Sequence, residues 1–231
     1  MAIALFFSTP SSSPTVNAQT EKHTLNGAAG AIEALKDLAL GTERKGTAII
    51  CHPHPLFAGT MNNKVVQTLA RAMVATGWDA WRFNFRGVGL SAGEHDGGVG
   101  EAEDLLRVIE QAAPEGPLVL AGFSFGTYVA SRVLAQVHAQ REIQAVVFVG
   151  TAASRFQVEP IPAALHVRSL VVHGEQDDTV PIGPVMDWAR AQSLPMLVLP
   201  GCEHFFHGRQ VQLKDLVVRH MQAVACMGAQ R

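Results

Sequence analysis

Cysteine is scarce in this sequence, with three residues in a chain of 231. Three thiols are too few for the disulfide framework of a small secreted domain, so the fold has to rest on a hydrophobic core. No run of 18 apolar residues occurs, and this excludes a membrane-spanning helix. An excess of one charge is also missing, since 18 basic and 20 acidic side chains give a net charge of −2. Binding to nucleic acid or to an anionic membrane is therefore not expected.

Apolar side chains, in contrast, make up 48% of the chain, against 16% for charged ones. Such a composition allows a large buried core. Residues 1–7 are apolar, but they lack the preceding positive charge of a secretory signal. Residues 8–20 are rich in Ser, Thr and Pro. We therefore expect a flexible arm over residues 1–20, a single domain over residues 21–231, and a cytoplasmic location.

From residue 47 onward, short apolar runs alternate with stretches of helical periodicity. Alternation of this kind predicts an α/β fold, with a mostly parallel twisted sheet and helices on both faces. A weaker pattern over 23–25 and 31–35, with Asn26-Gly27 and Gly30 between, predicts an antiparallel hairpin before it. The gap over 150–167 is too short for a large lid, so only a minimal cap is expected. The predicted strands are 47–51, 79–83, 117–121, 144–149, 168–172 and 196–199, and the predicted helices are 62–76, 99–113, 125–138, 182–192 and 210–225.

The most informative segment is Gly122-Phe123-Ser124-Phe125-Gly126, which lies between a predicted strand and a predicted helix. Gly-x-Ser-x-Gly in this position is typical of a nucleophile elbow. The turn is so tight that a side chain two positions before or after the serine would collide with backbone. The start of the helix also directs N–H groups toward any negative charge that develops near Ser124.

A serine nucleophile needs a base, and the base needs an acid to orient it. Two later loops supply them in the chain order that this elbow requires, acid and then histidine. The loop after the strand over 168–172 carries Asp177 and Asp178, and the loop after 196–199 carries His204. Because the carboxyl ends of parallel strands share one edge of the sheet, these groups are expected to meet Ser124 there.

These segments together resemble the α/β-hydrolase superfamily, and in particular a small bacterial branch with a His-Pro-His-Pro loop, related to dienelactone hydrolases and serine aminopeptidase-like hydrolases. The resemblance covers about residues 24–222. It includes Cys51 to Met61, with its His-Pro-His-Pro, and the segment from Arg82 to Ser91. In the superfamily pattern His-Gly-x-x-Asp-x-x-Val-Pro, the acid falls on Asp177, with Asp178 as the alternative. The resemblance implies an α/β-hydrolase fold and a triad of Ser124, Asp177 and His204.

Acyl transfer also needs N–H donors for the oxyanion. One is expected from Phe125, directly after the nucleophile, and the second from the loop that begins at His52. Since proline has no N–H, the candidates in this loop are His54, Leu56 and Phe57. Comparison with the superfamily favours His54, with Leu56 as the second choice. Several phenylalanines are candidates to line an apolar acyl pocket, foremost Phe57, Phe123 and Phe205.

Two other interpretations of these loops are weaker. His52 and His54 could share a metal ion, but a site needs a third ligand, and a structural histidine bonded to loop backbone is the simpler interpretation. The glycine-bearing loop over 84–91 lacks the Lys-Ser/Thr of a phosphate-binding loop. Its Arg86 is a candidate to attract an anionic substrate. No cofactor and no metal ion are therefore predicted.

The sequence thus predicts a serine hydrolase that cleaves small carboxylic esters, or thioesters or small amides, through an acyl-enzyme. A peptidase or a lactone hydrolase on the same triad remains open. A hydrolase fold that only binds a partner is a third alternative. The expected partner is a small-molecule ester, and either a monomer or a homodimer is compatible with the sequence.

Overall fold

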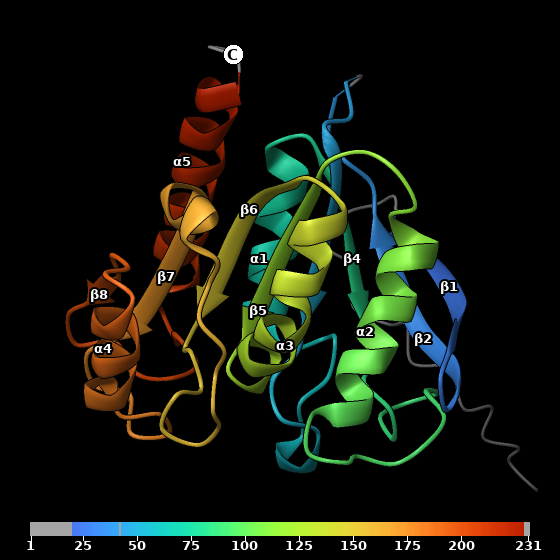
Figure 1. Ribbon diagram of the computed structural model, residues 1–231, viewed down its shortest axis with the longest axis horizontal. Coiled ribbons are helices and arrows are strands. Elements are labelled where there is room, and N and C mark those ends of the chain that lie inside the picture. Colours follow the sequence, from blue (N-terminus) through green and yellow to red (C-terminus); the bar gives the residue numbers. More distant parts are fainter. Residues whose placement is uncertain (1–19, 42, 229–231) are drawn as a thin grey trace, which may run out of the picture.

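The computed structural model describes residues 20–41 and 43–228, which form one eight-stranded sheet with helices packed on it (Figure 1). The strand order is β1-β2-β4-β3-β5-β6-β7-β8. The pairs β1–β2 and β2–β4 are antiparallel, and all other neighbours are parallel. The strands are β1 (Thr20–Gly27), β2 (Gly30–Asp37), β3 (Gly46–Cys51), β4 (Trp78–Phe83), β5 (Leu118–Phe123), β6 (Ile143–Val149), β7 (Ser169–Gly174) and β8 (Leu197–Leu199).

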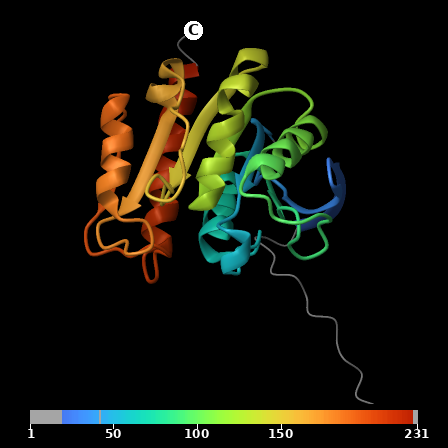
Figure 2. The same cartoon turned by 60° about the horizontal axis from the view of Figure 1, so that its bottom comes forward.

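Helices cover both faces of the sheet (Figure 2). The helices are α1 (Lys64–Ala75), α2 (Val99–Ala112), α3 (Phe125–Gln140), α4 (Ile182–Ala191) and α5 (Gln210–Gly228). Helices α1 and α5 pack together on one face, and α2, α3 and α4 lie on the other. Two short 3₁₀ turns, η1 (Pro55–Phe57) and η2 (Ala163–Arg168), lie in the connections. No helix of residues 20–41 and 43–228 is both long and apolar enough to cross a membrane.

The central strands are buried on both faces, which explains their continuous apolar sequences. In β3, Ala48 and Ile50 point into the core under α1 and α5, whereas Ile49 and Cys51 point into the core under α2 and α3. All four side chains are fully buried. Two separate hydrophobic cores therefore lie on the two faces of the sheet.

The predicted fold class is confirmed, including the antiparallel hairpin at the start. Helix α1 begins two residues later than predicted because Asn63 caps it, its side chain accepting a hydrogen bond from the N–H of Val65 at 2.8 Å. The strand predicted over 168–172 is β7, and it begins at Ser169 because Arg168 is the last residue of η2. The predicted arm lies outside the described residues, except for Thr20, which is the first residue of β1.

A buried ion pair ties the hairpin to the loop before α1. Asp37 on β2 and Arg82 on β4 are fully buried, with 2.8 Å between Oδ2 and Nε. Nη1 of Arg82 also donates to the Met61 carbonyl at 3.0 Å and to the Asn62 side chain at 3.1 Å. One guanidinium therefore serves three acceptors where water is excluded, and the segment leading into α1 depends on its orientation.

Asp37→Asn is expected to lower the free energy of unfolding by about 3 to 5 kcal/mol, because it leaves the Arg82 charge buried without a counter-ion. Glu110→Gln is the matched control, since it breaks an exposed pair with Arg107. That variant is expected to change stability by less than about 1 kcal/mol. Urea unfolding of the three proteins measures both values. Equal losses in the two variants would contradict this account of the buried pair.

Candidate active site

The sharp turn between β5 and α3 presents Ser124 at the carboxyl edge of the sheet. Ser124 has φ 54° and ψ −121°, a strained conformation for a residue with a side chain. A Cβ atom on Gly126 would lie 2.3 Å from the Cys51 carbonyl oxygen, and one on Gly122 would lie 2.6 Å from the backbone of Gly126. Both glycines of the motif are therefore required by backbone contact, as the sequence predicts.

The structure brings Ser124, His204 and Asp177 into one hydrogen-bonded line. Nε2 of His204 lies 3.0 Å from Oγ of Ser124, and its Nδ1 lies 2.6 Å from Oδ2 of Asp177. His204 is 2% exposed and Asp177 is 4% exposed, so the chain of bonds is shielded from water. The three side chains come from the ends of β5, β7 and β8, far apart in sequence.

Only one of the two candidate acids takes part in this line. The second oxygen of Asp177 accepts the backbone N–H of Val180 at 2.7 Å. His173, fully buried on β7, places Nε2 3.4 Å from Oδ2 of the same carboxylate. Asp178, in contrast, is exposed to solvent. The carboxylate beside His204 is thus anchored by the backbone. His173, which sequence reasoning had not singled out, lies next to it and donates from Nε2 to the Val180 carbonyl at 2.9 Å.

A cavity of about 310 Å³ opens beside Ser124. Of the three foremost phenylalanine candidates, only Phe57 lines it. Phe123 is fully buried under His204, with ring centroids 4.9 Å apart. Phe205 packs edge-on against His204 and is 40% exposed. The lining residues are His54, Phe57, Ser124, Phe125, Ala152, Arg155, Phe156, Thr179 and Val180.

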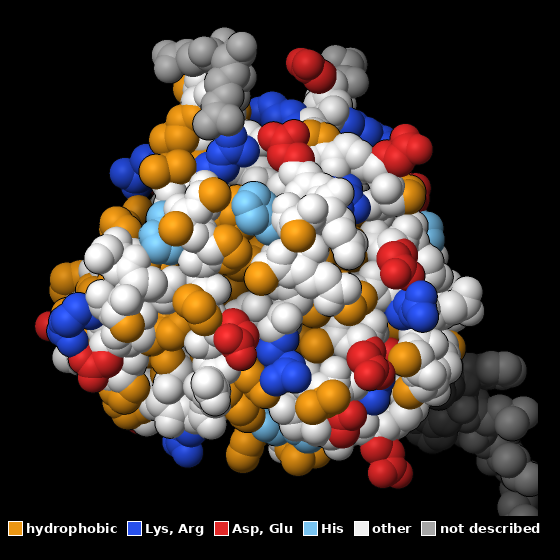
Figure 3. Space-filling model, in the orientation of Figure 1, with side chains coloured by type: hydrophobic (Ala, Val, Ile, Leu, Met, Phe, Trp, Pro, Cys, Tyr) orange, Lys and Arg blue, Asp and Glu red, His pale blue; other side chains and the backbone are white. Residues whose placement is uncertain are grey.

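Five of these lining residues were missed by sequence reasoning. Three come from the connection after β6 (Ala152, Arg155 and Phe156), and two from the loop after β7 (Thr179 and Val180). The connection after β6 has no motif and no periodicity, so no signal in the sequence could have found them. The apolar side chains of η1 stand at the same edge: Leu56 and Phe57 are 72% and 82% exposed, and apolar and histidine side chains gather along the lower edge of the molecule (Figure 3).

Of the predicted oxyanion donors, Leu56 is already engaged. Its N–H donates to Nδ1 of His54 at 3.2 Å, and the N–H of Phe57 donates to the His54 carbonyl at 3.1 Å. Within residues 20–41 and 43–228, no hydrogen bond uses the N–H of His54 or that of Phe125. These two N–H groups are therefore the ones free to receive an oxyanion, and both residues border the cavity.

His52 lies beneath the site and uses both ring nitrogens. Its Nδ1 donates to the Pro53 carbonyl at 2.6 Å, and its Nε2 accepts the N–H of Phe85 at 2.9 Å. Neither nitrogen is left for a metal ion. In the part of the chain that the structure describes, no three His, Cys, Asp or Glu side chains are grouped to hold one. His52 thus connects the loop after β3 to the loop after β4.

Acid is expected to weaken the fold through His52. Complete burial lowers the pKa of His52 to about 3, whereas the unfolded chain protonates near the ordinary value of 6.5. Between these values the unfolded state binds more protons, so the free energy of unfolding falls as the pH falls. From about pH 6.5 to about pH 4.5 the loss is about 2 to 3 kcal/mol. In His52→Gln, whose amide does not titrate, urea unfolding should show a smaller loss. If the variant loses as much unfolding free energy in acid as the native chain, His52 is not the group responsible.

Arg86 does not face the cavity. Its Nε lies 2.8 Å from Asp104 and its Nη1 3.3 Å from Asp96, and the residue is 9% exposed. The carboxylates raise its pKa, with the hydrogen bond to Asp104 as the largest cause. The suggestion that Arg86 attracts a substrate is therefore wrong, because its charge is already neutralised by Asp104 on α2 and by Asp96 before it.

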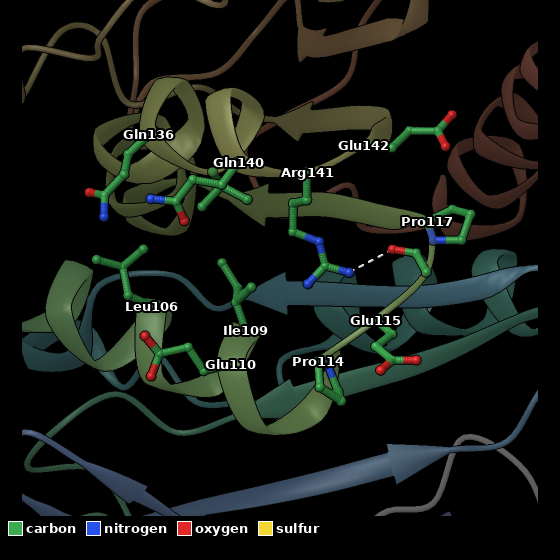
Figure 4. A pocket seen from close by; sticks show the side chains of 12 residues that line it. Leu106, Ile109, Glu110, Pro114, Glu115, Pro117, Gln136, Gln140, Arg141 and Glu142 are labelled. Atoms are coloured by element: carbon green, nitrogen blue, oxygen red, sulfur yellow. Dashed lines mark hydrogen bonds between the residues drawn. The ribbon is translucent and has the colours of Figure 1, made fainter.

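A larger cavity, of about 600 Å³, lies at the opposite edge of the sheet (Figure 4). It is bordered by the end of α2, the end of α3 and the turns that enter β5 and β6. The Arg141 guanidinium spans its wall and donates to the carbonyls of Ala113 and Gly116. Parallel sheets bind ligands at the carboxyl ends of their strands, and this cavity borders the amino ends. It therefore has no part in the chemistry at Ser124.

Comparison with known proteins identifies the family of this fold. A family profile described as the alpha/beta hydrolase fold matches residues 54–167. A serine hydrolase of Xanthomonas campestris, described as lacking a lid, is 33% identical, with TM-score 0.80, over 91% of this chain and 97% of that one. A serine hydrolase homologue of Coxiella burnetii is 40% identical, with TM-score 0.75, over 86% of this chain and 96% of the homologue. An uncharacterised protein of Rickettsia prowazekii is 29% identical over 69% of this chain and 71% of its own length.

Proposed function

Since the chain belongs to the α/β-hydrolase superfamily, we propose that it is a serine hydrolase that cleaves small carboxylic esters through an acyl-enzyme. One observation carries this proposal: the buried line from Asp177 through His204 to Ser124, with distances of 2.6 Å and 3.0 Å. A protein that only binds partners has no need of this arrangement, because a strained serine costs stability without contributing to binding.

In the proposed mechanism, Ser124 attacks the ester carbonyl while Nε2 of His204 takes the hydroxyl proton. Asp177 keeps the proton of His204 on Nδ1, so that Nε2 is the free base, and it stabilises the imidazolium that forms. The N–H groups of Phe125 and His54 would hold the oxyanion of the tetrahedral intermediate. His204 then returns the proton to the departing alcohol. Water, activated by His204, releases the acid and regenerates the serine.

The size of the cavity favours small substrates. About 310 Å³ is at the low end of the volumes of ligand pockets. The connections that surround it carry no helix longer than η2, a 3₁₀ turn of six residues. A compact acyl or alcohol group therefore fits better than a long acyl chain or a folded polypeptide. This supports an esterase over a peptidase.

Labelling with a fluorophosphonate tests the proposal, because the probe reacts with a serine that has both a base and an oxyanion site. Labelling of the folded native chain, absent in Ser124→Ala, is the expected result. A panel of short-chain esters, thioesters, lactones and aminoacyl amides then separates the alternatives. Faster turnover of amides would favour a peptidase, and faster turnover of lactones a lactone hydrolase. No labelling of folded protein would overturn the proposal in favour of a binding protein.

A further inference from the structure

The cavity beside Ser124 contains a single charged side chain. Among its nine lining residues, Arg155 is the only one with a charge, and no acidic residue is present. The other ionisable group in the lining is His54, and burial together with neighbouring His95 lowers its pKa and disfavours a positive charge there. Arg155 is therefore the one permanently charged side chain among those that line the cavity.

This guanidinium is anchored without being neutralised. Nε and Nη2 of Arg155 both lie 3.3 Å from the carbonyl oxygen of Thr179 on the opposite loop. Within residues 20–41 and 43–228, no carboxylate lies within ion-pair distance of Arg155. Arg86 differs in this respect, because it pairs with the carboxylates of Asp104 and Asp96. The carbonyl orients Arg155, and its Nη1 has no acceptor in the same part of the chain.

The turn that carries Arg155 is itself held in place. The N–H groups of Arg155 and Phe156 both donate to the Ala152 carbonyl at 3.0 Å. The N–H of Ala152 donates to the Thr127 hydroxyl at 3.2 Å, and the ring of Phe156 stacks on Tyr128 at 4.8 Å. The turn is thus bonded to α3, the helix that follows Ser124. The backbone of Arg155 is therefore held at a defined place relative to the nucleophile.

The remaining wall of the cavity is apolar and aromatic. The Phe125 ring lies 4.8 Å from the His54 ring and 5.2 Å from the Phe156 ring, and Phe57 stands beside His54 at 5.0 Å. A ligand that fills this space needs an apolar body to cover the rings. It also needs a group that satisfies the guanidinium, and carboxylate or phosphate suits it best.

We propose that Arg155 forms an anion subsite and that the preferred substrates are small esters with an apolar body and a carboxylate or phosphate at the end of the arm that fills the cavity. This inference rests on the proposed function, because it names the substrate class of the same site. It also corrects the expectation from sequence: an arginine does face the site, but it comes from the connection after β6.

Two matched pairs of esters test the subsite. In the first pair the charge is on the acyl arm: para-nitrophenyl hemiglutarate and its terminal amide. In the second it is on the alcohol arm: the acetate ester of hydroxybutyrate and its terminal amide. We expect kcat/KM to favour the anion about three- to fivefold in one pair or the other, because Arg155 is exposed to solvent. Arg155→Gln should abolish this preference, Arg155→Glu should reverse it, and added salt should weaken it.

Arg219→Gln provides the control, since Arg219 is also an exposed arginine, lies on α5 and donates to the carbonyl of Asp215. It should leave the preference unchanged. The same pairs are titrated calorimetrically into Ser124→Ala, which holds the ester uncleaved. Anion preference in that protein, lost in the double variant with Arg155→Gln, supports the subsite even if the native chain hydrolyses neither pair. Equal binding and equal turnover of anion and amide would overturn the subsite and leave the esterase proposal intact.

Discussion

Ester hydrolysis by Ser124→Ala is expected to be about 10⁴- to 10⁶-fold slower than by the native chain, because the variant has no nucleophile and His204 no longer has a proton to take. The measurement is kcat and KM for a short-chain para-nitrophenyl ester at neutral pH. KM should change far less than kcat, because the cavity walls keep their contacts. Activity within about tenfold of native would mean that another group attacks the ester, and the proposed mechanism would fail.

A second variant at the same position separates lost chemistry from lost structure. Ser124→Gly is expected to be as inactive as Ser124→Ala but more stable than native, by about 1 kcal/mol or more. The reason is the φ of 54° at Ser124, which glycine adopts without strain and alanine does not. Thermal unfolding of the native chain and of the two variants measures the differences. If Ser124→Gly is inactive but unfolds at a lower temperature than the native chain, the turn at Ser124 is not strained in the way proposed.

Asp177→Asn is expected to lower kcat about 10³- to 10⁴-fold. An amide in this place can donate to Nδ1 of His204, which would move the imidazole proton to Nε2 and remove the free base that faces Ser124. The amide also fails to stabilise the imidazolium. The adjacent variant Asp178→Asn has the same chemical change at an exposed position and should stay within about twofold of native.

The two variants together test which carboxylate supports His204, because only Asp177 lies 2.6 Å from its Nδ1. If Asp178→Asn proves to be the slower variant, the assignment of the acid is reversed. Equal losses in both would mean that the loop, and not one carboxylate, supports His204.

Much of the fold could be predicted because its signals are local. A buried parallel strand such as β5 is apolar throughout, and a helix such as α1 repeats apolar residues every three to four positions. The elbow could be recognised for the same reason. Positions 122 and 126 must be glycine because a Cβ atom there would collide with backbone of the turn itself or with the adjoining end of β3. Element ends were less exact, because a cap such as Asn63 competes with its neighbours over one or two residues.

The choice between two adjacent carboxylates required the tertiary structure. Asp177 and Asp178 are chemically the same, and the sequence pattern favoured the first without excluding the second. Asp177 faces His204 because the loop after β7 turns it inward, where the N–H of Val180 holds it at 2.7 Å. A contact across 27 positions depends on how two loops meet above the sheet, and no local pattern encodes such a meeting.

The sequence by itself determined the class of fold, the strand-turn-helix around Ser124, and the order of acid and base after it, because each depends on residues close together in the chain. Only the tertiary structure decided which side chains enclose the cavity. In the folded chain Phe123 lies beneath His204, Arg86 pairs with Asp104, and Arg155 lines the cavity beside Ser124. The physical reason is that burial and charge pairing are properties of neighbours in space, and packing of the sheet sets those neighbours.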